Sequence, residues 1–267
     1  MTAPAAGEQG PGEVPAHEVH ELAPRRTNYC VCIPVINEGA RIGRQLARMQ
    51  PVLGLADVVI ADGGSTDGSL ALPSLQAAGV RALLTKTGPG KLGAQIRMAF
   101  AWALGQGYRG VVLVDGNDKD DTAAIPRFLE ALAGGADFVQ GSRYAPGGRG
   151  VNTPCLRHLG VRLLHAPLLS LAAGRRYTDT TNGFRGYSRR FLEDPRVAPL
   201  RAVFTGYELH YYLAIRAARL GFTVLEVPVT RAYPARGPMP SKISPIRGSV
   251  NVLGALFASV LGRFDPP

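Results

Sequence analysis

Cysteine is scarce in this chain, which has only Cys30, Cys32 and Cys155 among its 267 residues and no CxxC spacing. An odd number of cysteines without paired spacing supports neither a disulfide framework nor a zinc knuckle. We therefore expect reduced thiols, as in a protein of the cytosol. Cys30 and Cys32 are two apart in a predicted strand, so both side chains should point to one buried face.

Long apolar runs are also lacking, because no stretch reaches the roughly 20 residues that a membrane-spanning helix needs. The nearest is Val250 to Leu261, which we interpret as an amphipathic or core helix, with contact to a membrane surface as the alternative. The first residues carry several glutamates and no apolar segment typical of an export signal. The expected location is the cytoplasm, with peripheral attachment to the inner membrane face left open.

The N-terminal segment 1–27 has little that it could bury. It carries Pro11, Pro15 and Pro24 among glycines and alanines, and it has no periodic apolar face. Such a segment cannot offset the entropy lost on ordering. We expect it to be a disordered tail.

Lysine is rare, with 4 of the 30 basic residues, and the other 26 are arginine; the formal net charge is +10. Arginine holds phosphate groups through a planar, bidentate fork. The arginines are scattered, without the basic block, zinc finger or aromatic motif that marks a nucleic-acid binder, so no nucleic-acid partner is expected. A diphosphate ligand, an anionic membrane surface and a merely solvated arginine-rich surface all remain open.

From Tyr29 to Val139 the sequence alternates between strand and helix patterns. Predicted strands are Tyr29 to Val35, Asp57 to Ala61, Val80 to Thr85, Gly110 to Val114 and Phe138 to Gly141; predicted helices are Ala40 to Met49, Leu92 to Leu104 and Asp121 to Ala133. Strand, helix and strand in units of about 30 residues indicate right-handed crossovers and a parallel sheet. The fold class is therefore α/β, and ligands of such a sheet sit beyond the carboxyl ends of its strands.

The region after Gly141 begins with loops rich in arginine, glycine and proline. Two further helices are predicted at Leu156 to Ala173 and Tyr207 to Leu220, and an alternating strand at Phe222 to Val229. A basic loop then runs to Arg247. This half of the chain should complete one domain with the first half.

An aspartate-bearing, glycine-rich turn follows the second predicted strand, as Asp62-Gly63-Gly64-Ser65-Thr66-Asp67. Glycines let the backbone approach a ligand, and a carboxylate at a strand end can accept hydrogen bonds from a base or a ribose hydroxyl. The alternative is an ordinary Asp-Gly turn in which Ser65 or Thr66 caps the next helix.

A second turn of the same design, Asp115-Gly116-Asn117-Asp118-Lys119-Asp120-Asp121, holds four carboxylates within seven residues. Mg²⁺ usually takes one or two carboxylates and completes its shell with water and substrate phosphates. Asp115 and Asn117 are two apart and could point the same way, so they are the candidate metal ligands. Asp120 and Asp121 are better explained as first-turn residues of the next helix.

A rival motif is Gly88-Pro89-Gly90-Lys91-Leu92-Gly93, which formally matches the GxGxxG of dinucleotide-binding proteins. It would make the protein an NAD(P)- or FAD-dependent oxidoreductase. The motif follows the third strand and not the first, and its supposed ribose acid lies in the acidic cluster. Both features argue against that function.

Taken in order, seven blocks of the chain resemble inverting family 2 glycosyltransferases of the GT-A fold, and among them the polyprenol-phosphate mannosyl- and glucosyltransferases. The blocks are Ile33 to Glu38, Asp62 to Asp67, Gly90 to Gly93, the Asp115 cluster, Gly141 to Tyr144, Asn182 to Arg185 and Glu226 to Val229. The resemblance covers about residues 28–245. It implies a GT-A catalytic domain there, followed by a C-terminal amphipathic helix or tail at 246–267.

The resemblance also implies roles for individual residues. Pro34 and Glu38 would border the nucleotide of a UDP- or GDP-sugar, Asp62 would read its base or ribose, and Lys91 would lie beside the donor. Asp115 and Asn117 would hold Mg²⁺ or Mn²⁺ against the diphosphate. The arginines and lysine expected to clamp phosphates are Arg143, Arg185, Arg231 and Lys242.

Two departures from the family pattern bear on the metal site. Gly63 replaces the second aspartate of the usual DDGS turn, and Asn117 replaces the last acid of DxD, so Asp118 or Asp120 could supply the missing charge. A non-catalytic nucleotide-binding relative is therefore a further alternative.

The acceptor decides whether the reaction needs a base. A polyprenyl phosphate is already a nucleophile, whereas the hydroxyl of a soluble metabolite must lose a proton, for which Asp179 or Glu208 are the candidate catalytic bases. His210 is the histidine nearest this set, but a single histidine is more often structural. Association into a homo-oligomer is left open.

Overall fold

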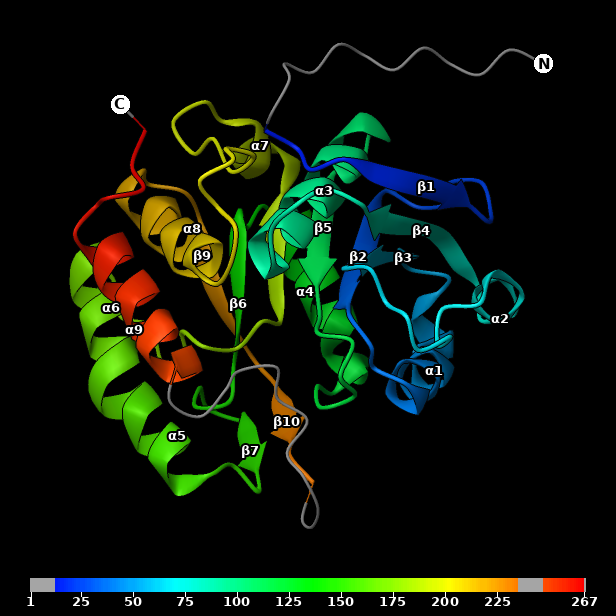
Figure 1. Ribbon diagram of the computed structural model, residues 1–267. Coiled ribbons are helices and arrows are strands. Elements are labelled where there is room, and N and C mark those ends of the chain that lie inside the picture. Colours follow the sequence, from blue (N-terminus) through cyan, green and yellow to red (C-terminus); the bar gives the residue numbers. More distant parts are fainter. Residues whose placement is uncertain (1–12, 235–246, 267) are drawn as a thin grey trace.

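A computed structural model describes residues 13–234 and 247–266, and its core is a sheet of eight strands with helices on both faces (Figure 1). The strand order is β1-β4-β3-β2-β5-β8-β6-β9. Strands β2, β3, β4 and β5 run parallel, as do β6 and β9, whereas β1 and β8 pair antiparallel with their neighbours. The predicted mostly parallel α/β sheet is confirmed.

The strands and helices have the following bounds. The strands of the large sheet are β1 His17–Glu21, β2 Tyr29–Val35, β3 Asp57–Asp62, β4 Val80–Lys86, β5 Gly110–Leu113, β6 Phe138–Ser142, β8 Arg185–Ser188 and β9 Val224–Pro228, and a separate pair is formed by β7 Arg149–Val151 and β10 Thr230–Ala232. The helices are α1 Ala40–Arg48, α2 Leu72–Ala77, α3 Leu92–Gly105, α4 Ile125–Ala133, α5 Cys155–Gly160, α6 Ala166–Ala173, α7 Arg189–Glu193, α8 Glu208–Arg219 and α9 Arg247–Val260. Short helical turns lie at η1 Gln50–Val52 and η2 Thr122–Ala124, and the π-helical turn η3 Val161–His165 joins α5 to α6.

Side chains along each buried strand point alternately to the two faces of the sheet, which produces two apolar layers. Cys30, Cys32 and Val59 point to the face covered by α3, α6 and α8, while Val31 and Ile60 point to the face covered by α1 and α4. The prediction that both cysteines share a buried face is confirmed, and their Sγ atoms lie 3.9 Å apart. Because both faces are covered, the strands are apolar along their whole length.

The prediction of a disordered N-terminal tail is wrong for part of its length. Residues 17–21 form β1, which pairs antiparallel with β4 from His17 opposite Lys86 to Glu21 opposite Ala82. Backbone hydrogen bonds hold this strand, and its side chains contribute little burial, so no apolar pattern marked it. Its histidines and glutamates suit an edge strand, since charge discourages pairing with another chain.

The C-terminal segment forms helix α9, which packs against α8 and α6 (Figure 1). Leu256 is fully buried in the same apolar layer as Leu209 and Leu213 of α8, whereas Phe257 is 45% exposed. The prediction of an amphipathic or core helix is confirmed. No helix in the described part of the chain is long and apolar enough to cross a membrane.

Candidate functional site

The two Asp-Gly turns lie side by side because both are hydrogen-bonded to the end of β2. Val35 is in register with Asp62 of β3, and its carbonyl accepts the Gly63 N–H at 2.8 Å. The carbonyl of Pro34 accepts the Gly116 N–H at 3.3 Å. Asp62 and Asp115 therefore flank the carboxyl end of β2, the edge where an open α/β sheet binds ligands.

Gln95 of α3 explains why the first turn has glycine at position 63. Its side-chain amide donates to the carbonyls of Val35 and Ala61 at 2.9 and 3.0 Å, and a Cβ added at Gly63 would lie 2.8 Å from the amide nitrogen. The space that an aspartate would need is thus filled by a buried amide.

Asp62 is 4% exposed and orders its own turn, since its Oδ1 accepts from the Ser65 N–H at 2.9 Å and the Ser65 hydroxyl at 2.6 Å. The turn is linked to the loop after β2, where the Asn37 side chain accepts the Thr66 N–H at 2.7 Å. Glu38 in that loop is buried and pairs with Arg41 at 2.8 Å. The predicted nucleotide-bordering residues thus form one connected rim, although their contact with a nucleotide stays a prediction.

Arg231 of β10 lies between two carboxylates of the second turn. Its guanidinium donates to Asp115 at 2.8 Å and to Asp120, which is 1% exposed. Burial alone would raise the pKa of Asp115, but the charge of Arg231 outweighs it and holds that pKa below its ordinary value. For the more deeply buried Asp120, desolvation prevails and raises the pKa.

The residues predicted to bind metal have suitable donor atoms. The Asn117 side-chain nitrogen donates to Asp115 at 3.3 Å, while its buried Oδ1 has no hydrogen-bond partner. The Asp115 side chain is 28% exposed. Among the described residues no group of three or more acidic, histidine or cysteine side chains could enclose an ion. A carboxylate and an amide oxygen are donors that Mg²⁺ accepts, and such a pair would suit an open site that substrate phosphates complete.

Asp118 and Asp120 were suggested as the second acid of the metal site, but neither carboxylate is free to bind a metal together with Asp115. Asp118 adopts a positive φ of 62° and turns toward α1, where it pairs with Arg44 at 3.1 Å and Arg48 at 2.6 Å. Asp120 is held by Arg231, as described above. Both suggestions disagree with the geometry, because each carboxylate is already paired with arginine side chains.

Lys119 is a site residue that sequence reasoning missed. It is 7% exposed, and its Nζ lies 5.3 Å from the centre of the Tyr233 ring. Burial and the nearby Arg231 lower the pKa of Lys119. Its position within the acidic cluster, beside Asp118 and Asp120, was the available signal.

Arg143 and Asp179 form a buried bidentate ion pair, with distances of 2.7 and 2.9 Å. Asp179 is fully buried, and Arg143 also donates to the Thr181 hydroxyl at 2.8 Å. Asp179 is therefore not placed to accept a proton from a substrate, and Arg143 is not placed to clamp a phosphate. Sequence reasoning could not pair two residues that lie 36 positions apart.

Arg185 is likewise used within the protein. It is 1% exposed and donates to the carbonyls of Asn182 at 3.0 Å, Thr180 at 2.8 Å and His210. These bonds tie the loop before β8 to α8. The prediction of a phosphate clamp at Arg185 disagrees with these contacts, since no free edge of the guanidinium faces the site.

Glu208 and Lys91 meet where α3 and α8 begin. The Glu208 carboxylate accepts the backbone N–H groups of Thr205 and Gly206, and the Lys91 N–H donates to the Thr205 carbonyl at 2.9 Å. The Lys91 side chain is exposed. Glu208 therefore orders the loop that leads into its own helix, and this use of its carboxylate disfavours a general base.

His210 is buried, and its charge state is influenced by the Asp115 carboxylate. Desolvation and the charge of Arg185 lower its pKa to about 3, although the Asp115 carboxylate acts in the opposite direction. Its Nδ1 is buried without a hydrogen-bond partner. The histidine is therefore neutral at physiological pH. The last predicted site residue, Lys242, lies outside the described residues.

The glycines of the rival GxGxxG motif are required by packing within the chain. A Cβ at Gly88 would lie 2.8 Å from the Ala16 nitrogen, and one at Gly93 would lie 2.7 Å from the Gly206 carbonyl oxygen. At both glycines the nearest atoms belong to the protein backbone and leave no room for a pyrophosphate. The dinucleotide alternative thus loses its structural support.

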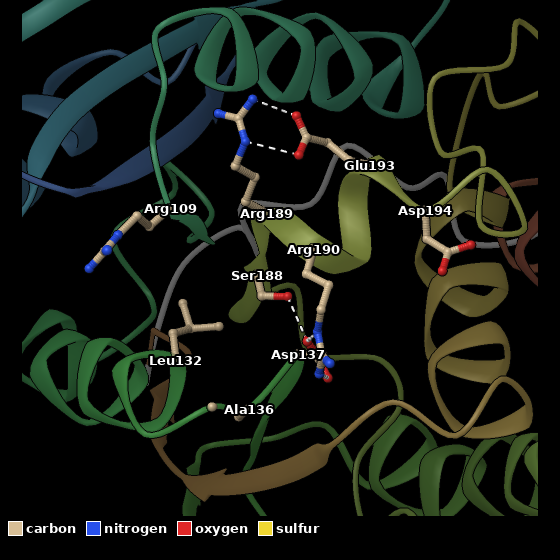
Figure 2. Close-up of a pocket in the computed structure, with 10 residues that line it drawn as sticks. Arg109, Leu132, Ala136, Asp137, Ser188, Arg189, Arg190, Glu193 and Asp194 are labelled. Atoms are coloured by element: carbon tan, nitrogen blue, oxygen red, sulfur yellow. Dashed lines mark hydrogen bonds and ion pairs between the residues drawn. The ribbon is translucent and has the colours of Figure 1, made fainter.

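A pocket elsewhere in the molecule is remote from this edge. Arg109 and Asp137 precede β5 and β6, so the pocket that they line opens at the amino ends of those strands (Figure 2). Most of its charges are already paired, Arg190 with Asp137 and Arg189 with Glu193. It is therefore not the predicted donor site.

An open α/β sheet with aspartate turns after the two strands that flank β2 is the architecture of glycosyltransferases with a GT-A fold. Glycosyl transferase family 2 matches residues 30–194, and the chain belongs to this family and is a glycosyltransferase. Both the predicted family and the predicted enzyme class are confirmed.

Two relatives illustrate the similarity. Polyprenol monophosphomannose synthase of Mycolicibacterium smegmatis is 30% identical over 272 residues, which cover 99% of this chain and 97% of that protein. Undecaprenyl-phosphate mannosyltransferase of Micrococcus luteus is 34% identical over 202 residues, which cover 74% of this chain and 81% of that protein.

Solved structures confirm the fold. Glucosyl-3-phosphoglycerate synthase from Mycobacterium tuberculosis, in complex with Mn²⁺, UDP and phosphoglyceric acid, superimposes with a TM-score of 0.65 at 19% identity, covering 90% of this chain and 79% of that one. The same enzyme with Mg²⁺ and UDP gives a TM-score of 0.64. At this identity the likeness concerns the fold alone.

Proposed function

We propose that the protein transfers a mannosyl group from a nucleoside-diphosphate sugar to a polyprenyl phosphate, with inversion and with Mg²⁺ or Mn²⁺ as cofactor. The names of the two relatives support the sugar and the acceptor. The main support for a donor site is the position of Asp115 at the carboxyl end of β5. Asn117 lies beside it, and the Arg231 guanidinium is 2.8 Å from its carboxylate.

The state of the two candidate bases supports a phosphate acceptor. Asp179 is buried in an ion pair with Arg143, and Glu208 accepts backbone N–H groups of the loop before α8. A hydroxyl acceptor would need one of them to take its proton, whereas a phosphate monoester attacks as an anion and needs no base. Transfer to a phosphate is therefore the reaction that fits these side chains, because it needs neither of them as a general base.

Charge stabilisation is the remaining requirement, because breaking the bond between sugar and diphosphate leaves a negative group. A divalent ion held by Asp115 and Asn117 would neutralise that charge as a Lewis acid. Arg231 and Lys119 add positive charge at the same strand end, and their field would stabilise the negative leaving group although Arg231 is itself paired with Asp115 and Asp120. Asp62 and the linked Asn37 loop form the rim assigned to the nucleoside.

The test is a transfer assay with purified protein. GDP-mannose and UDP-glucose are each offered with undecaprenyl phosphate, phosphoglyceric acid or a simple alcohol, in Mn²⁺, in Mg²⁺ or with EDTA. We expect mannosyl transfer to undecaprenyl phosphate that EDTA abolishes, and NMR of the product should show the inverted anomeric configuration. Transfer only to phosphoglyceric acid or to the alcohol would reject the proposed acceptor.

Asp115→Ala tests the metal site. We expect a loss of about 100-fold or more in kcat/KM, the order seen when a charge-stabilising group is removed, and loss of the thermal stabilisation that Mn²⁺ adds to bound GDP or UDP. The matched control is Asp121→Asn, since Asp121 caps η2 and is exposed. An Asp115→Ala protein that keeps the Mn²⁺-dependent stabilisation would remove this residue from the metal site.

A further inference from the structure

Strand β1 forms one end of the large sheet, where β4 is its neighbour (Figure 1). The carbonyl of Ala16 accepts a backbone hydrogen bond from the residue after β4 at 2.9 Å, and the N–H of Leu22 donates to β4 at 2.7 Å. In an antiparallel pair such bonds recur at every second residue. His17, Val19 and Glu21 therefore turn their backbone N–H and C=O groups away from β4, toward the outer edge of the sheet.

The other terminal strand of the sheet, β9, has a partner within the chain. The carbonyl of Val224 in β9 accepts a hydrogen bond from the Arg175 guanidinium at 2.7 Å. Within residues 13–234 and 247–266, no group forms a hydrogen bond with the outward backbone groups of β1. An edge strand with unpaired backbone groups is a template for pairing with a strand of another chain.

The side chains of β1 are arranged so that the strand complements a reversed copy of itself. The strand reads His-Glu-Val-His-Glu from His17 to Glu21. In an antiparallel pair of two copies centred on Val19, His17 faces Glu21 of the second copy and Glu18 faces its His20. Each histidine thus lies opposite a carboxylate, which can accept a hydrogen bond from the imidazole.

Backbone geometry and charge both favour the pairing centred on Val19. Outward backbone groups bond only to outward groups, so the two strands can slip only in steps of two residues. A slip in one direction sets Glu18 opposite Glu18 of the second copy, and a slip in the other sets His20 opposite His20. Charges that discourage pairing with a strand of a different sequence therefore favour a second copy of this strand in one register.

The side chains that this pairing needs are accessible. Glu18 and His20 are exposed and form no hydrogen bond or ion pair with the described part of the chain, and Val19 is 41% exposed. His17 is bonded within the chain through Nδ1 alone, and Glu21 through Oε1 alone. Each of these two side chains thus keeps a second polar atom for a partner.

We propose that two copies of the chain associate through β1 as an antiparallel, two-fold symmetric pair that continues the sheet from one copy into the other. A contact area of one short strand is small, so the dimer exchanges with the monomer. The paired strands run in opposite directions, which places Asp115 of the two copies at opposite ends of the joined sheet. The association requires no nucleotide, sugar or acceptor and is tested independently of the proposed transfer reaction.

The experiment is sedimentation velocity of the full chain over a range of protein concentrations. We expect a monomer–dimer equilibrium. Glu18→Lys sets a lysine opposite His20 twice in each symmetric dimer and should raise the dissociation constant at least about tenfold. Adding His20→Glu restores opposite charges and should return the dissociation constant to within about threefold of the unmodified value.

The matched control is Glu130→Lys, which makes the same change of charge at an exposed position of α4. Its dissociation constant should equal that of the unmodified chain, and thermal unfolding checks that all variants fold. An unmodified chain that stays monomeric would overturn the proposal. So would a dimer that Glu18→Lys leaves intact, or one that the added His20→Glu does not restore.

Cross-linking tests the register. In a Cys155→Ser background, which removes the exposed thiol, Val19→Cys brings two sulfurs together across the symmetry axis. Residues opposite each other there have Cα atoms about 5.5 Å apart, within the range of a disulfide. His20→Cys is the control, because His20 and its copy are diagonal neighbours about 7–8 Å apart, which a disulfide does not span.

We expect mild oxidation to produce a disulfide-linked dimer of the Val19→Cys protein and little or none of the His20→Cys protein. A non-reducing gel measures both yields. Equal yields in the two variants, including no linkage in either, would overturn the proposed pairing.

Discussion

Arg231 contacts the carboxylates of Asp115 and Asp120, which are five residues apart on the loop after β5. Asp120 is almost completely buried, and two positive charges favour its ionised form, Arg231 more strongly than Arg143. A buried charge that loses its partner is strongly destabilising, whereas removing both partners is much less costly. The arginine thus stabilises the fold and positions Asp115, the proposed metal ligand. Because its guanidinium is already paired with two carboxylates, the prediction of a phosphate clamp at Arg231 disagrees with the structure.

Arg231→Gln should therefore lower the free energy of unfolding by about 3–5 kcal/mol. Adding Asp120→Asn to this variant should restore a large part of the loss, because the unpaired charge is then absent. Urea titration followed by circular dichroism measures both values. Arg196→Gln, at an exposed ion pair with Asp194, is the control and should change nothing measurable. A double variant no more stable than the single one would contradict the pairing.

His210 makes a second residue-scale prediction, this time about pH. Its pKa is about 3 in the folded protein and 6.5 in the unfolded chain. Between these values the unfolded chain binds a proton that the folded protein does not, so stability falls as the pH falls. The slope from one such group reaches about 1.4 kcal/mol per pH unit.

His210→Gln removes this contribution and should flatten the dependence of stability on pH between 6.5 and 4. The measurement is urea unfolding of both proteins at several pH values in EDTA. Carboxylates titrate in both proteins, so the difference between the two curves isolates the histidine. Parallel curves would mean that His210 is not buried in its neutral form.

At the scale of elements, close contact between α3 and the loop before α8 sets the position of Lys91 and Glu208. Gly93 allows this contact, because a Cβ there would meet the backbone of Gly206 and Phe204 at 2.7 to 2.9 Å. Backbone atoms cannot rotate away as a side chain can. The glycine is therefore required by packing, and not by a bound dinucleotide.

Gly93→Ala should destabilise the protein by about 1–3 kcal/mol, since overpacking forces the backbone to shift. Gly43→Ala is the matched control, because Gly43 lies in α1 with nothing within 4 Å of an added Cβ. That change should stabilise the protein by about 0.5–1 kcal/mol through helix propensity. Equal effects of the two substitutions in urea unfolding would argue against the close approach.

The elements that sequence periodicity located are those that bury an apolar face. Helices α3, α4 and α8 and strands β2 to β6 lie within a few residues of their predicted bounds. β1 and β8 were missed, because backbone pairing with β4, β5 and β6 holds them and their own side chains show little pattern. The predicted helix from Leu156 to Ala173 is continuous, but it contains the π-helical turn η3.

At the scale of the whole molecule, α9 belongs to the core of the catalytic domain. Leu256 is buried with the residues of α8, and the loop after α9 pairs Asp265 with Arg216 at 3.6 Å. A C-terminal tail could be removed without consequence, whereas a core helix could not. The two cases differ in measurable stability.

Leu256→Ala should lower the free energy of unfolding by about 2–5 kcal/mol, as for other buried leucines. Its neighbour Phe257 is 45% exposed, so Phe257→Ala should cost about 1 kcal/mol or less. Thermal and urea unfolding compare the two variants directly. If both have the same small effect, α9 is an appendage and the boundary predicted at residue 246 marks a separate tail.

Local sequence patterns were sufficient to predict the α/β class and the two aspartate turns, and the order of seven such blocks along the chain indicated the glycosyltransferase family. A strand followed by an Asp-Gly turn is a local pattern, and β2 to β5 bury continuous apolar runs that reveal themselves in the sequence. Only the tertiary structure decided which charges are free. Arg143 is paired with Asp179, and Arg185 donates to backbone carbonyls. Arg231 contacts Asp115, which lies 116 positions away in the sequence. Such pairings depend on which strands become neighbours, and the energy of a buried charge is determined by those neighbours and not by its place in the sequence.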